Sequence, residues 1–552
     1  MSDSKLEFRL SFSGGGFRAT FYCLGAFRRL VELGLADKVV SISSVSGGSI
    51  TAGAIMNGLS QRPFADINDF DKKVTEPLRK LGQVRLRELI TWPVYIIWFV
   101  FTFFYFQRIA PFVDSVLTLL CPFKISSWFI LINLSVYSLI VYFFLKPTAL
   151  FSRLFLFSLF LFFKGNRMQS LKKLPEWSVN AACLNTGKRF QFTQNSFGGH
   201  NIGVTENNKD IRVSFAVACS AAFPPVFAPF KINLKGRNFR YMSYDKPVKN
   251  QEAVLLTDGG VYDNLGSEPF LSLNDSFIRQ ADGKNKKEEC FIVFDAGDYI
   301  SSWSSSGHWF STTGRIIASA LDQIICLRRR LIYRETTTGL PGILLILGRP
   351  VEEYIDNGAI AKNTFEKEFP DGETIFDWLM SNNYFEETSG VKGHLKSFTD
   401  DLLDSLRNKY PDRYVQILSI LQQFHNIFGR LSEKIVSMHE YKEFLDKNKM
   451  EVIDNYLQDI RTDLDGFHDI EIDVLMWAGA VRMDIAIKRY LGEHIPHIQT
   501  NDVPRMPQYS AERIKQILLK SRRESFWITL RGFLHWHLHE KVRCKNKSDP
   551  FF

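Results

Sequence analysis

Two glycine-rich turns, each set between a strand-like run and a helical one, constrain this chain more than any other feature. The first is Ser13-Gly-Gly-Gly-Phe-Arg-Ala19 and the second is Ser44-Val-Ser-Gly-Gly-Ser49. Apolar and polar side chains alternate over 6–12, as in a strand, and a helical pattern then runs to Gly34, a residue suited to a left-handed cap. A β-rich run over 39–45 precedes the second turn. The two turns therefore share one predicted architecture of strand, turn and helix.

The first turn has the chemistry of an anion site. Gly14, Gly15 and Gly16 lack a β-carbon, so a substrate oxygen can approach the backbone closely. The unpaired N–H groups and the dipole at the start of the following helix favour negative charge. Arg18 adds a fixed positive charge, suited to supporting an oxyanion or a lipid phosphate.

The second turn places Ser46 where a strand passes into a helix, the position of a nucleophile elbow. Gly47 and Gly48 give the turn room, whereas Ser44 stands where the elbow usually has glycine. Either turn alone could be purely structural. Both in this order predict a nucleophile and the donors for the charge that its attack creates, which indicates an acyl hydrolase.

A third element supplies a candidate base. Residues 253–257 form a short strand-like run that ends in Asp258-Gly259-Gly260. An aspartate there could take the Ser46 proton and later activate water. The alternative is an aspartate that only begins a turn, for which Asp-Gly is a strong signal.

These three elements resemble the patatin-like phospholipases, and the first turn is also similar to that of the related cytosolic phospholipases. Three more stretches match the same pattern: Leu184-Asn-Thr-Gly-Lys188, Cys219-Ser-Ala-Ala-Phe-Pro-Pro225, and Arg461-Thr-Asp-Leu-Asp465, the last similar to the segment that opens a late helix in bacterial members. The resemblance implies a three-layer α/β hydrolase fold with a Ser–Asp dyad. Ser46 would be the nucleophile and Asp258 the base. The glycines at 14–16 would line the oxyanion hole, with support from Gly47 and Arg18.

The activity that the resemblance implies is hydrolysis of fatty-acyl esters of membrane phospholipids through an acyl-enzyme, with no metal and no cofactor. The usual family form has Asp in place of Ser13 and Gly in place of Ala19, so substrate preference stays open. Two alternatives also stay open. The same dyad could transfer the acyl group to an alcohol, as a lipid transacylase does, or the fold could serve as a catalytically silent membrane scaffold.

Two uncharged apolar runs, 90–106 and 126–145, are near the length of a membrane-spanning helix. We expect them to form a transmembrane hairpin, the alternative being buried core helices. Residues 154–163 are too short for a third span and favour an interfacial or re-entrant helix.

Basic residues flank this hairpin on its outer sides. They are Arg79, Lys80, Arg85 and Arg87 before it, and Lys146, Arg153, Lys164 and Arg167 after it. The positive-inside rule then places the catalytic domain on the cytoplasmic side. Seven cysteines, odd in number and scattered, suit a reducing compartment.

The net charge of +9 is concentrated near the end of the chain, where residues 511–552 hold ten Lys or Arg against four Asp or Glu. Interleaved aromatic residues suit an anionic membrane surface, while a merely solvated helix is the alternative. No recognition motif accompanies the charge, so nucleic acid is not an expected partner. The expected partners are the phospholipid substrate, the lipid bilayer and an unidentified activator.

The expected organisation has five parts, with an α-helical C-terminal region. They are 1–84, the first part of the patatin-like catalytic domain; 85–170, the transmembrane hairpin insertion; 171–361, the rest of the catalytic core; 362–500, a helical region packing on that core; and 501–552, a basic tail.

Overall fold

A computed structural model describes the chain over the following ranges, apart from a few single positions within them. They are 6–60, 63–84, 147–224, 226–240, 252–271, 288–297, 309–338, 342–351, 365–395, 400–428, 446–491 and 503–523, with isolated positions between 100 and 135. The spans expected at 90–106 and 126–145 lie outside the described residues, isolated positions excepted. Among the described residues, no helix has both the length and the apolar character needed to cross a bilayer.

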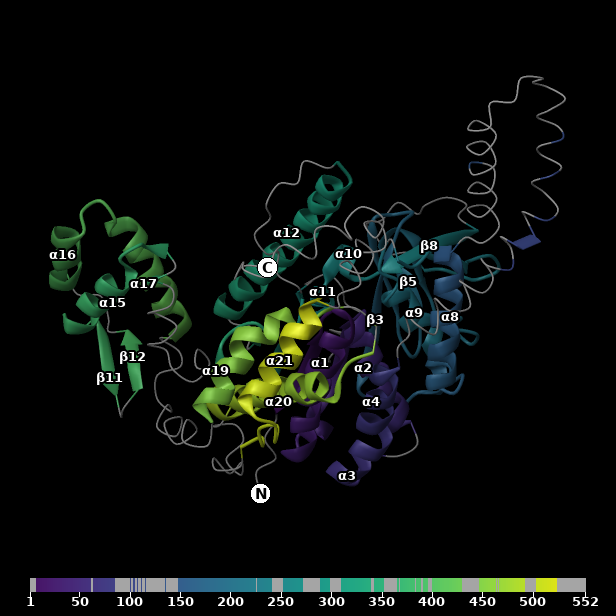
Figure 1. The fold of residues 1–552 in the computed structure, drawn as a ribbon, viewed down its shortest axis with the longest axis horizontal. Helices are drawn as coiled ribbons and strands as arrows, with labels where there is room; N and C mark the ends of the chain where they lie inside the picture. The colour runs from purple at the N-terminus through teal and green to yellow at the C-terminus, as the bar shows by residue number, and fades with distance from the viewer. Residues whose placement is uncertain are drawn as a thin grey trace.

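A ten-stranded mixed sheet forms the centre of the molecule (Figure 1). Its strands are β1 (Leu6–Phe12), β2 (Val39–Val45), β3 (Glu176–Cys183), β4 (Lys188–Phe192), β5 (Phe197–Gly199), β6 (Gly203–Thr205), β7 (Phe230–Asn233), β8 (Ala253–Asp258), β9 (Glu288–Asp295) and β10 (Gly342–Ile346). The order is β10-β9-β1-β2-β3-β4-β5-β6, and β8 pairs with both β3 and β7. Neighbours from β10 to β3 run parallel, and all pairs beyond β3 run antiparallel.

Helices flank this sheet. They are α1 (Gly16–Glu32), α2 (Gly47–Leu59), α3 (Ile67–Phe70), α4 (Glu76–Gln83), α8 (Pro147–Phe162), α9 (Val213–Ser220), α10 (Gly260–Asp263), α11 (Glu268–Leu271), α12 (Trp309–Thr338), α19 (Lys447–Tyr456), α20 (Asp469–Leu491) and α21 (Ala511–Arg523). The strands expected at 6–12 and 39–45 are confirmed, as are the helices that follow them. The α/β fold with a helical C-terminal region is therefore the one that the sequence predicts.

The strand β1 lies in the interior of the sheet, because β9 and β2 pair with its two edges. Phe8, Leu10 and Phe12 lie in the main hydrophobic core, as their alternation predicts. Of the polar residues between them, Arg9 is half-buried, whereas Ser11 is fully buried. Ser11 donates to the carbonyl of Leu265 at 2.5 Å, and Ser13 Oγ accepts from the Ala296 N–H at 2.8 Å. Serine is tolerated here because each buried hydroxyl has a partner.

The closest helix packing joins α1 to α20. Gly25 faces the carbonyl of Met476, and Gly479 faces that of Tyr22, so closely that a β-carbon at Gly25 would lie 1.9 Å from the Met476 oxygen. A buried ion pair between Arg29 and Asp484 reinforces the contact at 2.8 Å. The late helix therefore holds α1, and with it the first glycine turn, against the sheet.

The helix α8 lies within the expected insertion 85–170, yet one of its faces belongs to the core. Phe155, Leu159 and Phe163 recur at helical spacing and are buried, and Ser152 donates to the carbonyl of Ala228 at 3.0 Å. Since α8 packs on α9, it is part of the folded catalytic core.

The region expected at 362–500 divides into two packing groups. The first contains α15 (Gly372–Ser381), β11 (Phe385–Thr388), β12 (Val391–Leu395), α16 (Asp400–Lys409) and α17 (Tyr414–Phe428). It has a hydrophobic cluster of its own around Ile375 and Leu406. The second group, α19 and α20, belongs to the main core. The first helix of the basic tail, α21, buries Ile514 and Leu518 in that core, and residues 524–552 lie outside the described residues.

Filling the α1–α20 contact should destabilise the fold. In Gly479→Val, the added side chain would meet the Tyr22 carbonyl, because a β-carbon there already lies 2.0 Å from that oxygen. We expect a loss of roughly 1–3 kcal/mol, the usual result of overpacking, measured as a lower unfolding temperature of the detergent-solubilised chain. Glu451→Val, at an exposed position on α19, is the matched control. An unchanged unfolding temperature in Gly479→Val would contradict the packing described.

Candidate active site

Ser46 occupies a sharp turn at the junction of β2 and α2. Its backbone angles, φ 50° and ψ −120°, lie in a region that non-glycine residues rarely adopt. This is the geometry expected of a nucleophile elbow, which holds a side chain above the end of a sheet. Ser46 is 8% exposed. Gly47 must be glycine here, since a β-carbon would lie 1.9 Å from the carbonyl oxygen of Gly16.

That contact also brings the two predicted turns together. The Gly48 N–H donates to the Ser13 carbonyl at 3.1 Å, and Thr20 Oγ1 donates to the Gly47 carbonyl at 2.9 Å. A β-carbon on Gly14 would lie 3.2 Å from Cβ of Ser46. The first glycine turn therefore lies directly beside the serine, as the sequence predicts.

The three glycines of the first turn differ in the use of their N–H groups. The Gly14 N–H donates to the carbonyl of Asn264 at 2.8 Å, so it is already engaged. Gly15 precedes α1 with φ at 137°, and Gly16 begins that helix. Gly47 begins α2. The first N–H groups of a helix have no partner inside it, so Gly15, Gly16 and Gly47 are the better candidates for oxyanion donors.

Asp258 reaches this site because two strands meet end to end along β3. One edge of β3 is covered by β4, so β2 and β8 must share the other edge. They approach from opposite directions: Val45, the last residue of β2, pairs with Asn180, and Asp258 pairs with the adjacent Ala181. The residue after the end of β2 is Ser46. The topology therefore brings Ser46 and Asp258 to one point.

The Asp258 carboxyl is buried, at 3% exposure, and only one of its oxygens is engaged. Its Oδ1 accepts from the Gly260 N–H at 2.7 Å. Within the described part of the chain, its buried Oδ2 has no hydrogen-bond partner. Burial raises the pKa of Asp258 to about 6, while the nearby Ser46 hydroxyl and the Gly260 N–H act in the opposite direction. Such a carboxyl can both accept and return a proton near neutral pH.

Ser220, the last residue of α9, holds the elbow in place, although sequence reasoning gave it no role. Its Oγ accepts from the Ser46 N–H at 3.0 Å and donates to the Asn180 carbonyl at 2.6 Å. Its backbone carbonyl accepts from the Gly259 N–H at 3.1 Å. Ser220 thus touches the strand ends on both sides of the site. The signal for it was the match at Cys219-Ser-Ala-Ala-Phe-Pro-Pro225.

Arg18 has a different environment from the one that the sequence suggests. Its guanidinium is 1% exposed and donates to main-chain carbonyls, to Ala296 at 2.9 and 3.1 Å and to Ile460 at 3.0 Å. These contacts tie the start of α1 to the segment before α20. Direct support of an oxyanion or a lipid phosphate by Arg18 stays a prediction, whereas its role in positioning the glycine turn follows from the contacts.

One protein family and several solved structures are similar to this chain. The sequence pattern of the patatin-like phospholipase family matches residues 10–271. Among solved structures, human GIVD cytosolic phospholipase A2 is similar at 13% identity over 54% of this chain and 46% of that one, with a TM-score of 0.30. Its complex with methyl gamma-linolenyl fluorophosphonate is similar at 14% identity, over 54% and 41%, with a TM-score of 0.28.

VipD from Legionella pneumophila is similar at 13% identity over 94% of this chain and 92% of that one, with a TM-score of 0.23. The chain spans less than half the length of the human phospholipase structures that it matches. No curated protein is a significant match.

The family match begins within β1 and ends after α10, so it contains both glycine turns, Ser220 and Asp258. Residues 10–271 of the chain therefore form a domain that matches the patatin-like phospholipase family.

Proposed function

We propose that this chain is a membrane-anchored lipid acyl hydrolase in which Ser46 is the nucleophile and Asp258 the general base. The observation that carries the proposal is the meeting of β2 and β8 at Asn180 and Ala181, which brings the serine to a buried carboxyl oxygen without another partner among the described residues. A strained serine beside a buried carboxyl with only one oxygen engaged is costly to the fold and is explained by use in catalysis.

In the first half of the reaction, Ser46 Oγ bonds to the acyl carbonyl carbon while Asp258 Oδ2 takes the hydroxyl proton. The carbonyl oxygen becomes an oxyanion beside the N–H groups of Gly15, Gly16 and Gly47. Loss of one such donor typically costs about 10²–10³ in rate. When the ester bond breaks, the departing lysolipid oxygen takes the proton back from Asp258, and the acyl group stays on the serine.

Water completes the cycle. It gives a proton to Asp258 and its oxygen bonds to the acyl carbon of the acyl-enzyme. The acyl–Ser46 bond then breaks, Asp258 returns the proton to Ser46 Oγ, and the fatty acid is released. The pKa of about 6 suits this alternation, because the Asp258 carboxyl must accept a proton twice and return it twice in each turnover.

The membrane anchor in this proposal comes from the sequence. The uncharged apolar runs 90–106 and 126–145 and their basic flanks support a hairpin with the catalytic domain on the cytoplasmic side. Such an anchor would keep the site at the surface that holds its substrate, which raises the effective substrate concentration.

Removal of the nucleophile should abolish turnover. In Ser46→Ala, we expect fatty-acid release from defined phospholipids, followed by mass spectrometry, to fall by at least about 10³, the scale for loss of a serine nucleophile. The change should also abolish labelling by a fluorophosphonate. Ser60→Ala, at the other end of α2, is the matched control and should keep both signals.

Each other outcome has a definite meaning. Release or labelling that persists in Ser46→Ala would overturn the nucleophile assignment. A wild-type chain that is neither labelled nor active would be a scaffold. An acyl product that appears only when an acceptor lipid is added would identify a transacylase.

Ionisation of Asp258 should set the acid limb of the pH profile. Because only the carboxylate can take the Ser46 proton, we expect kcat/KM to fall about tenfold for each pH unit below about 6 and to be level above it. A soluble ester as substrate keeps the lipid phase constant during this measurement. A flat profile from pH 4.5 to 8 would exclude Asp258 as the base.

The same carboxyl should make stability depend on pH. Its ordinary pKa is 3.8 and its folded value is about 6, so between these values the folded chain holds a proton that the unfolded chain has lost. The free energy of unfolding therefore falls as pH rises through this window, by roughly 3 kcal/mol in all.

The substitution Asp258→Asn removes this pH-dependent contribution to the free energy of unfolding. We expect the variant to unfold at a higher temperature than wild type at pH 8 and at a similar temperature near pH 4. Because all other titrating groups are shared, the difference between the two proteins isolates Asp258. A difference that does not change with pH would contradict the raised pKa.

A further inference from the structure

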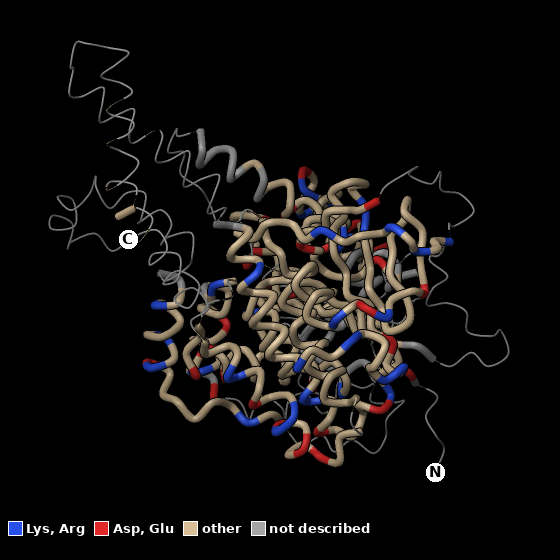
Figure 2. Tube along the Cα trace, turned by 90° about the vertical axis from the view of Figure 1, so that its right-hand side faces the viewer, with Lys and Arg blue, Asp and Glu red and all other residues tan. Residues whose placement is uncertain are grey.

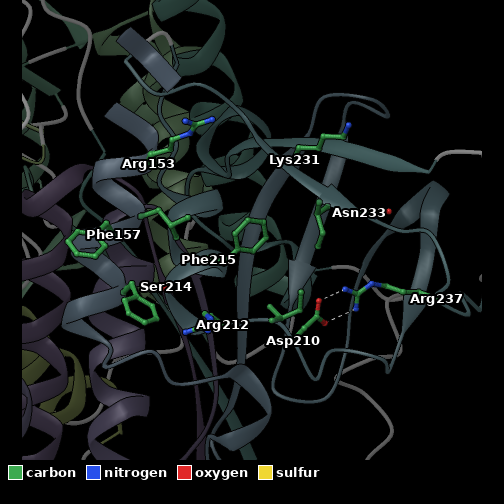
Figure 3. A pocket seen from close by; sticks show the side chains of 13 residues that line it. Arg153, Phe157, Asp210, Arg212, Ser214, Phe215, Lys231, Asn233 and Arg237 are labelled. Atoms are coloured by element: carbon green, nitrogen blue, oxygen red, sulfur yellow. Dashed lines mark hydrogen bonds and ion pairs between the residues drawn. The ribbon is translucent and has the colours of Figure 1, made fainter. Parts of the chain in front are cut away.

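A second concave site lies away from the serine, between α8, the start of α9 and β7 (Figure 3). Its cavity has a volume of about 510 Å³, and none of its lining residues belongs to the candidate active site. We call it the α8–β7 pocket. Arg153 and Phe157 come from α8, Arg212 from the residue before α9, and Lys231 from β7.

The pocket lining is strongly positive. Arg153, Arg212, Lys231 and Arg237 face a single acidic residue, Asp210, which leaves a formal excess of three positive charges. Asp210 is held by Arg237 at 3.0 Å, and Figure 3 shows this pair on the side of the pocket away from Arg153 and Lys231. Within the described residues, neither Arg153 nor Lys231 is in an ion pair. These two cations are therefore available to an anionic ligand.

Charge of this kind is local to the pocket rather than general. Figure 2 shows basic and acidic positions interspersed over the described surface. Many of the other basic side chains have acidic partners, such as Lys235 with Glu252 and Arg240 with Glu206. The electrostatic potential at the α8–β7 pocket therefore favours binding of an anion.

The rim of the pocket is apolar and exposed. Phe157 and Leu161 on α8 are 57% and 59% exposed, although the opposite face of that helix is buried in the core. Arg153, Phe157 and Leu161 follow one another at intervals of four and so form one stripe. Arg212 lies over the Phe160 ring, 4.8 Å from its centroid. An exposed apolar stripe with cations beside it is typical of a helix that lies at a membrane surface.

The position of α8 in the chain points to the same surface. It begins at Pro147, directly after the apolar run 126–145 and Lys146. If that run enters the bilayer as we propose, the first turns of α8 must leave it at the head-group level. Lipid phosphates are found at that level, beside acyl chains that can cover Phe157 and Leu161.

We propose that the α8–β7 pocket binds the phosphate head group of an anionic phospholipid in the bilayer, with Arg153 and Lys231 as the contacting cations and Phe157 against the lipid's apolar part. A soluble phosphate would leave the apolar stripe uncovered, which is why we commit to the lipid. The site is separate from the dyad, and binding requires no turnover. One helix nevertheless connects the two, because Ser214 lines the pocket at the first turn of α9 and Ser220 contacts Ser46 at its end.

The test measures binding in the full chain carrying Ser46→Ala, so that no lipid is consumed and a failure of the proposed catalysis cannot affect the result. The detergent-solubilised protein is titrated with dihexanoyl phosphatidylglycerol, with dihexanoyl phosphatidylcholine and with glycerol 1-phosphate, and Kd is obtained by thermophoresis. We expect saturable binding of the anionic lipid, and weaker binding of the other two by about tenfold or more, because phosphatidylcholine has no net charge and glycerol 1-phosphate has no acyl chains.

Variants assign this binding to the pocket. The double variant Arg153→Gln with Lys231→Gln should raise the Kd for the anionic lipid by about tenfold. The control, Lys188→Gln with Lys235→Gln, changes two exposed cations outside the pocket and should leave this Kd unchanged. Phe157→Ser should weaken binding of the anionic lipid and leave binding of glycerol 1-phosphate unchanged. An unfolding temperature equal to that of the Ser46→Ala parent checks that each variant is folded.

Three results would overturn the proposal. Equal affinity for the two lipids would remove the role of charge. Equal loss in the two double variants would show that total charge matters and the pocket does not. Glycerol 1-phosphate that binds as tightly as the lipid would make this a site for a soluble phosphate.

Discussion

The edge of β3 opposite β4 is the constraint on which the site depends. Along this edge β2 and β8 run toward each other and stop at adjacent residues, Asn180 and Ala181. A strand end is where a chain can turn a side chain out of the sheet, and here two such ends face each other. Ser46 and Asp258 need no loop to bring them together, since Ser46 directly follows β2 and Asp258 is the last residue of β8. The positions of the glycine turn, of Ser220 and of the buried carboxyl are all set relative to this junction.

The sequence predicts the local part of this arrangement well. The strands at 6–12 and 39–45, the two turns and the helices after them follow from alternation and from glycine placement, which are short-range signals. Which distant segment packs against each turn depends on contacts between residues far apart in the sequence. Nothing near Asp258 in the sequence says that β8 shares an edge of β3 with β2, and the dyad came from a resemblance.

The missed residues share this cause. Asn264 contributes its backbone carbonyl, which accepts a hydrogen bond from the Gly14 N–H. Because every residue type has such a carbonyl, the sequence cannot single out Asn264. The Ser220 hydroxyl has three partners, Ser46, Ser49 and Asn180, and all lie at least 40 positions away. Arg18 looked available because its turn is glycine-rich, but the fold brings the carbonyls of Ala296 and Ile460 to its guanidinium. In each case the deciding contact is tertiary, and no local pattern encodes it.

The separation of the dyad in the sequence has a consequence for how the protein is made. Ser46 and Asp258 are 212 positions apart (258 − 46), and both apolar runs lie between them. At about 5–20 residues per second, the ribosome needs roughly 10–40 s to pass from one to the other. Through that interval the emerging chain has its serine, its glycine turn and its apolar segments, but not β8. If the chain is anchored and catalyses as we propose, a partly made chain cannot hydrolyse the membrane that it enters, because Ser46 still lacks Asp258. The order of translation would then protect the cell before any regulator could.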